Sequence, residues 1–163
     1  MEKARLLLRL RVWLGLFIVG LALSGATAFP LRAELRIMLG VLTRFVSSQS
    51  GQMMWLNKVH DALESTGERY PFLAYGTDWL AFGHLVIALA FVGAWRDPIR
   101  NKWLFTFGLI SCAAVVPLAM IAGEVRGIPF YWRLIDCSFG VFGAVPLLIC
   151  KRYVTRLEQA TAS

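Results

Sequence analysis

The chain has 163 residues, of which 58% are hydrophobic and 17% are charged, and its formal net charge is +7. A soluble domain is usually about half apolar and about one quarter charged, so this composition argues against a water-soluble protein. The length suits one domain with about four membrane spans of ~20 residues and short connections. We therefore predict an all-α integral membrane protein, a single domain over residues 1–163 that forms a four-transmembrane-helix bundle.

The first predicted span covers residues 12–31, twenty positions without a charge that follow a basic head from Met1 to Arg11. This length is enough to cross the hydrocarbon core. A second interpretation stays open, because the basic head, the apolar stretch and the small residues Ala26-Thr27-Ala28 also match a secretory signal that is cleaved near residue 28. Both interpretations place residue 32 on the outer side of the membrane.

An amphipathic segment at residues 32–73 follows on the outer side. From Leu31 to Val46, apolar residues recur at helical spacing with basic residues opposite them. The polar residues 47–51 interrupt this pattern, and a second short helix is predicted from Met53 to Glu64, ended by Ser65-Thr66-Gly67. Neither helix is long and apolar enough to span. They either lie in the outer membrane interface or pack on each other as a cap.

Three further spans are predicted at residues 74–95, 103–123 and 130–150. Between the first two of these, Asp97-Pro98 is a helix-start signal in a tight polar turn over residues 96–102. After the last, residues 151–163 are predicted to be a cytoplasmic tail, frayed from Val154 to Ser163.

The basic residues predict the orientation of the chain. Ten of the seventeen Lys and Arg residues lie in the head, the 96–102 turn and the tail. Short segments rich in these residues stay in the cytoplasm, so both termini are predicted to be cytoplasmic in a multi-pass protein of the inner (cytoplasmic) membrane. The lipid bilayer is then the first partner, and the basic clusters suit its anionic lipids. No recognition motif favours nucleic acid.

Six ionisable residues in or beside the predicted spans form the candidate ligand-binding site. They are Asp78, His84, Glu124, Arg126, Arg133 and Asp136. Charged groups within a membrane are costly, so they usually have a partner or a task. His84 and Asp136 each lie on a helix face with small residues, and such faces pack against other helices. We expect the six to line one cavity in the outer half of the bundle.

In this hypothesis His84 and Asp136 exchange a proton with a bound ligand, while Arg126 and Arg133 hold its anionic groups. Structural alternatives stay open for these residues. Arg133 and Asp136 are spaced (i, i+3) and can form an ion pair, Asp78 can cap its helix, and His84 can make a single hydrogen bond.

The function predicted from these features is binding of a small polar or amphipathic ligand, such as a lipid headgroup, a quinone or an isoprenoid, in an outer-facing polar cavity. The alternative is a non-enzymatic structural subunit or assembly partner, which contacts another membrane protein or a second copy of itself. No motif identifies an enzyme, a cofactor or a metal site. Cys112, Cys137 and Cys150 all fall in apolar runs and are interpreted as packing residues.

Overall fold

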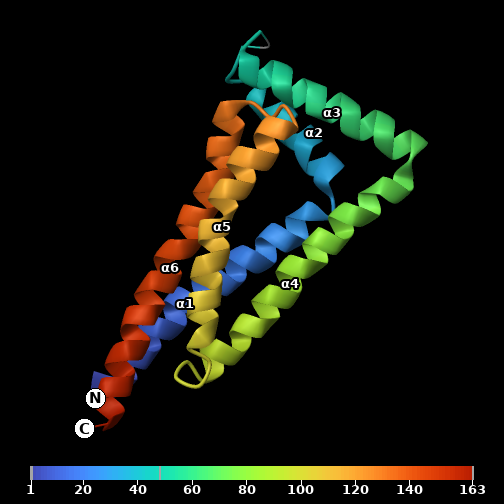
Figure 1. The fold of residues 1–163 in the computed structure, drawn as a ribbon. Coiled ribbons are helices and arrows are strands. Elements are labelled where there is room, and N and C mark those ends of the chain that lie inside the picture. Colours follow the sequence, from blue (N-terminus) through green and yellow to red (C-terminus); the bar gives the residue numbers. More distant parts are fainter. Residues whose placement is uncertain (1, 48, 163) are drawn as a thin grey trace. The chain divides into compact units, whose positions relative to one another are not determined.

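The computed structural model describes residues 2–47 and 49–162. Within them the chain forms helices and turns and no strand (Figure 1), which confirms the all-α prediction for this part of the protein. The elements in chain order are α1 (Glu2–Ala28), α2 (Leu31–Leu42), α3 (Gly51–Arg69), the 3₁₀ helix η1 (Pro71–Leu73), α4 (Ala74–Arg96), α5 (Trp103–Val125) and α6 (Phe130–Ala162).

Four of the described helices, α1, α4, α5 and α6, are long and apolar enough to cross a membrane. The helices α4 and α5 agree with the predicted spans to within two residues. A glycine in a left-handed conformation follows the end of α5. Gly127 has a φ of +67°, a left-handed conformation that glycine adopts without strain. The amides of Gly127 and Ile128 donate to the carbonyls of Glu124 and Gly123, which satisfies the end of the helix.

Two helix boundaries differ from the prediction. Helix α1 begins at Glu2, so the described part of the basic head is helical. Helix α6 continues to Ala162, so the prediction of a frayed tail is wrong for the residues that the structure describes, and Ser163 lies outside them. The additional turns are held by packing, because Val154 and Leu157 of α6 are buried together with Leu10 of α1.

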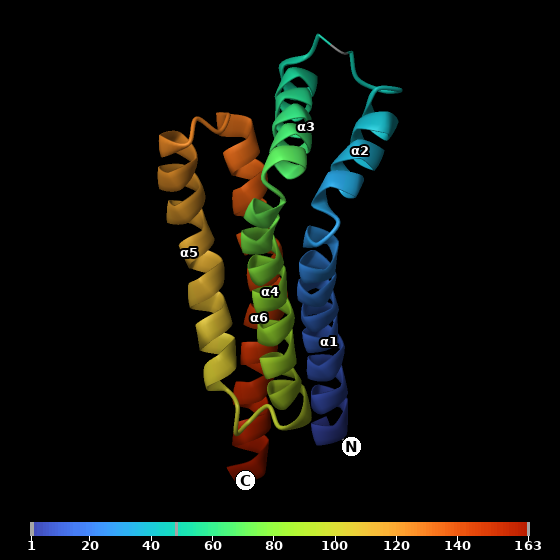
Figure 2. The ribbon, with the colours of Figure 1, turned by 90° about the vertical axis from the view of Figure 1, so that its right-hand side faces the viewer.

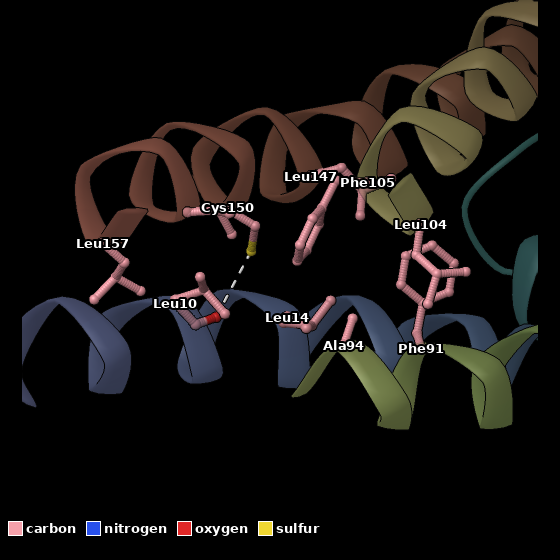
Figure 3. Packing of buried hydrophobic residues seen from close by; sticks show 10 residues of the cluster. Leu10, Leu14, Phe91, Ala94, Leu104, Phe105, Leu147, Cys150 and Leu157 are labelled. Atoms are coloured by element: carbon pink, nitrogen blue, oxygen red, sulfur yellow. Dashed lines mark hydrogen bonds between the residues drawn. The ribbon is translucent and has the colours of Figure 1, made fainter. Parts of the chain in front are cut away.

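The chain divides into two compact units, and α1 and α4 contribute to both. Unit 1 contains the chain up to Gly20 and from Ala88 onward. Its core is a cluster of buried apolar side chains from α1, α4, α5 and α6 (Figure 3): Leu10, Leu14, Phe91, Ala94, Leu104, Phe105, Leu147, Cys150, Val154 and Leu157. The Cys150 thiol donates a hydrogen bond to the Leu10 carbonyl at 3.6 Å.

Within unit 1, α5 and α6 form an antiparallel hairpin and lie side by side (Figure 1). Glycines of α6 allow this contact. A methyl group at Gly140 would lie 2.5 Å from the carbonyl oxygen of Cys112, and one at Gly143 would lie 2.9 Å from the Cys112 sulfur. Small residues let helices approach closely where lipid supplies no competing hydrophobic force, so the small-residue face of α6 packs against α5.

Unit 2 covers Leu21–Ile87. In it, α2 and α3 run antiparallel (Figure 2) and bury Leu35, Met53 and Leu56. The predicted helix from Leu31 to Val46 ends early, at Leu42. Helix α3 is longer than predicted and continues through residues 65–67 to Arg69, so the predicted break there is wrong. Ser48, in the predicted interruption between the two helices, lies outside the described residues.

Candidate functional site

A pocket of about 540 Å³ lies within unit 2. The end of α1, the first turns of α2, the last turns of α3 and the first turns of α4 form its walls. Much of the lining is apolar and includes Phe29, Leu31, Leu63 and Leu73. Pockets for small molecules are usually about 300–1,000 Å³ and mainly apolar with a few placed polar groups, so the size and lining suit a ligand.

A charge cluster lies at the α2 side of this pocket. Arg36 donates to a Glu64 carboxylate oxygen at 2.7 Å, and the Arg32 guanidinium lies 4.0 Å from the other oxygen. The hydrogen bond from Arg36 holds the pKa of Glu64 below its ordinary value of 4.5. Gly67 of α3 leaves space for Arg32, because a methyl group there would lie 2.5 Å from a guanidinium nitrogen.

Asp78 lies on the α4 side of the same pocket and is half-buried. Within the part of the chain that the structure describes, no salt bridge or side-chain hydrogen bond is recorded for its carboxylate. The pocket and its immediate surroundings therefore carry two guanidiniums, from Arg32 and Arg36, and two carboxylates, from Glu64 and Asp78. Hydroxyl-bearing side chains also line the pocket, namely Thr66, Tyr70 and Thr77.

His84 is half-buried on α4 and does not line the pocket. Its Nδ1 lies 2.8 Å from the carbonyl oxygen of Leu80. Because a carbonyl oxygen only accepts, Nδ1 carries the proton and donates it along the helix. The Cβ of His84 faces Gly25 of α1, where an added methyl group would lie 2.9 Å away. His84 therefore lies against a neighbouring helix and makes one hydrogen bond within its own.

Arg133 lies in the first turn of α6, near the connection between α5 and α6 in unit 1. It is 14% exposed, forms a salt bridge with Glu124, donates to the Met120 carbonyl at 3.4 Å and lies over the ring of Phe130. The ion pair between Arg133 and Asp136 that the sequence permits is not formed in the described structure. The Arg133 stem fills the space beside Gly123, and its guanidinium pairs with Glu124 near the end of α5.

The remaining candidates of unit 1 are Asp136, which is half-buried in α6, and Arg126, which is exposed at the end of α5. Neither has a recorded side-chain partner among the described residues. The six predicted residues thus divide between the units, with Asp78 and His84 in unit 2 and the other four in unit 1. Their convergence on one cavity stays a prediction. In residues 2–47 and 49–162, no three His, Cys, Asp or Glu side chains are close enough to hold a metal ion.

Comparison with protein-family models, with curated proteins and with solved structures finds no match to this chain. The functional assignment therefore rests on the chemistry of the pocket. Sequence reasoning missed two of its polar residues, Arg32 and Arg36, which were placed opposite the apolar face of an amphipathic helix. Their (i, i+4) spacing on α2 and the acidic Glu64 on the next helix were the available signals.

Proposed function

We propose that this chain is a multi-pass protein of the inner membrane that binds a small amphipathic ligand in the unit 2 pocket. The observation that carries the proposal is the pocket itself: an apolar cavity of about 540 Å³ with a few charged and hydroxyl-bearing side chains in its lining. The pocket departs from the sequence hypothesis, because Asp78 alone of the six candidates lines it.

Membrane insertion is supported by helix length and by the outward side chains. Helix α4 has 23 residues and is therefore about 35 Å long, against a hydrocarbon core of about 30 Å. Apolar side chains on all four long helices are more than half exposed, including Leu16, Leu89, Leu118 and Phe142. Apolar surface on this scale is unusual for a soluble monomer and suits contact with lipid.

The charge balance of the pocket favours a neutral or zwitterionic polar group on the ligand. The two guanidiniums and two carboxylates compensate each other, so a ligand with a net charge would leave one of them unbalanced. A quinone, an isoprenoid alcohol or a zwitterionic headgroup has a polar end for Tyr70 and Thr77 and an apolar body for Leu63 and Leu73.

A pocket-filling variant tests the proposal. The protein is extracted in a mild detergent, and co-purified small molecules are identified and quantified by mass spectrometry. Ala33→Phe places a ring in the pocket lining, whereas Ala62→Phe places the same ring on an exposed position of α3 outside the pocket. We expect Ala33→Phe to lose the ligand and Ala62→Phe to retain it. Equal retention by both variants, or no enriched molecule in the parent, would contradict the proposal.

The orientation with cytoplasmic termini is supported by the ten basic residues of the head, turn and tail, and is tested by labelling. Single cysteines replace Phe45, Arg100 or Ala160 in a chain whose three native cysteines are changed to alanine. An impermeant maleimide added from the outer side should label only the first. Outer labelling at Arg100 or Ala160 would reverse the orientation.

The alternative function, a non-enzymatic subunit, is favoured by a different surface. Ile37, Val41 and Phe45 at the outer helices are at least half exposed and do not line the pocket. If these side chains contact another membrane protein, changing Ile37 and Val41 to Asp should reduce the size of the complex measured after extraction, without loss of any bound small molecule.

A further inference from the structure

The net charge of the chain is concentrated at one end of unit 1. Residues 2–11, 96–102 and 151–158 contain ten of the seventeen basic residues but only three of the ten acidic residues. Their excess is +7, which equals the net charge of the whole chain, so the remaining residues carry equal numbers of both signs. We call these three segments the basic end.

Within unit 1, the first segment contacts Trp95, the residue directly before the second segment, and the second segment contacts the third. Arg11 donates to the Trp95 carbonyl at 3.2 Å, and the Trp95 indole donates back to the Arg11 carbonyl at 3.1 Å. Lys102 of the turn pairs with Glu158 of α6 at 2.7 Å. Residues of all three segments also line one pocket, so parts of the three segments lie together.

This second pocket has a volume of about 340 Å³. Two cationic side chains, Lys3 and Arg96, line it beside apolar residues. Those residues are Ala4, Leu7, Pro98, Ile99 and Leu157. Among the described residues, neither cation has a recorded carboxylate partner.

Asp97 also lines this pocket. A carboxylate oxygen of Asp97 accepts from the Arg100 amide at 3.1 Å, which holds the carboxylate in its own turn.

From this arrangement we infer that the second pocket holds the phosphate group of an anionic phospholipid. Lys3 and Arg96 supply the positive charge that a phosphodiester requires, and a guanidinium can donate two hydrogen bonds to its oxygens. Leu7 lies one helical turn from Lys3 and offers apolar surface to the glycerol and the first acyl carbons. Free phosphate uses the same cations but leaves this apolar wall in water, so a lipid is the better match.

Matched double variants test the inference. Lys3→Gln with Arg96→Gln removes the two cations of the pocket. Arg5→Gln with Arg100→Gln removes two cations of the same basic end that do not line it. Each protein is placed in phosphatidylcholine nanodiscs, and its affinity for phosphatidylglycerol is measured by native mass spectrometry over a series of lipid fractions. Circular dichroism and thermal unfolding in phosphatidylcholine alone show that each variant is folded.

We expect the pocket variant to bind phosphatidylglycerol about tenfold to thirtyfold more weakly than the parent, because each basic residue near a surface contributes about a factor of five. The control variant should stay within about threefold of the parent, because its lost charges act only through the screened surface field. Equal weakening of both variants would overturn the inference in favour of a diffuse charged surface. Competition by inorganic phosphate at the same concentration as the lipid would overturn the assignment to a lipid.

Discussion

The close contact between α5 and α6 at Gly140 predicts that a larger residue at this position destabilises the protein. In Gly140→Ala, the new methyl group would lie 2.5 Å from the carbonyl oxygen of Cys112. An ordinary contact begins at 3.4 Å, so the two helices must separate locally by about 0.9 Å. The oxygen belongs to the backbone of α5, so it cannot turn away as a flexible side chain would.

Two effects of this substitution oppose each other. Alanine is favoured over glycine within a helix by about 1 kcal/mol, whereas overpacking of a close contact costs about 1–3 kcal/mol. A gap of 0.5–1 Å also removes about a quarter to a half of the dispersion energy of each separated contact. We therefore expect Gly140→Ala to lower the free energy of unfolding by about 1–2 kcal/mol.

Gly20→Ala is the matched control, because a methyl group at Gly20 of α1 would have no neighbour within 4 Å. The helix propensity term of about 1 kcal/mol is the same in both variants, so the difference between their free energies of unfolding isolates the steric term and should be about 2–3 kcal/mol. Reversible unfolding by dodecyl sulfate in mixed micelles, followed by circular dichroism, measures both free energies. The reasoning is refuted if Gly140→Ala is as stable as Gly20→Ala.

Three further predictions address the ion pairs and the end of α6. Arg133→Met should lower the free energy of unfolding by about 1–3 kcal/mol, because Arg133 is largely buried. Glu124→Gln should lower it by less than about 1 kcal/mol, because Glu124 is 72% exposed. Similar losses for both variants in unfolding titrations would contradict this difference. Since the folded-state pKa of Glu64 is lowered, its contribution to the contact between α2 and α3 is present above pH 4.5 and is lost as the pH falls through that lowered pKa. A spin-label distance between α2 and α3 should therefore increase on acidification, and Glu64→Gln should remove this dependence. Val154→Asp should lower the free energy of unfolding by about 3 kcal/mol, because Val154 is 3% exposed. Thr155 is exposed, so Thr155→Asp should change this free energy by less than about 0.5 kcal/mol. Equal effects of the two variants would show that this part of α6 is not packed.

The parts of the fold that were predicted correctly have strong local signals. Helices α4 and α5 lie in long apolar runs, and α5 ends at Val125, two residues before Gly127 with its left-handed conformation. The helix start predicted at Asp97-Pro98 is wrong, because the Asp97 carboxylate accepts from the Arg100 amide in a turn and α5 begins at Trp103.

The errors arise where a distant contact overrides the local signal. Residues 65–67 were predicted to end a helix, but the Ser65 hydroxyl donates to the Asp61 carbonyl at 2.7 Å, and Gly67 accommodates the guanidinium of Arg32. The tail was predicted to fray because it is polar, but Val154 is buried within the unit 1 core. The hydrogen bond of Ser65 is local to its own helix, but Arg32 is remote in sequence from Gly67, and Leu10 is remote from Val154. Neither propensity nor periodicity contains the information on these two remote partners.

The sequence specifies less about the geometry of a site than about the helices, because that geometry depends on packing between helices. The spacing of Arg133 and Asp136 permits an ion pair, but Arg133 pairs with Glu124 of α5 and its stem packs beside Gly123. The unit 2 pocket depends on how α2 packs against α3, which hydrophobic periodicity does not specify. Asp78 was predicted as a site residue because a carboxylate within an otherwise apolar helix can be recognised from the residue types alone.

The hydrogen bond between Cys150 and Leu10 joins residues 140 positions apart, which has a consequence for biogenesis. A ribosome adds about 5–20 residues per second, so the Leu10 backbone waits on the order of ten seconds after its own synthesis before Cys150 exists. Trp95, which exchanges two hydrogen bonds with Arg11 of α1, is synthesised before Cys150. The core of unit 1 is therefore assembled in sequence, and its closure waits for one of the last helical turns to leave the ribosome.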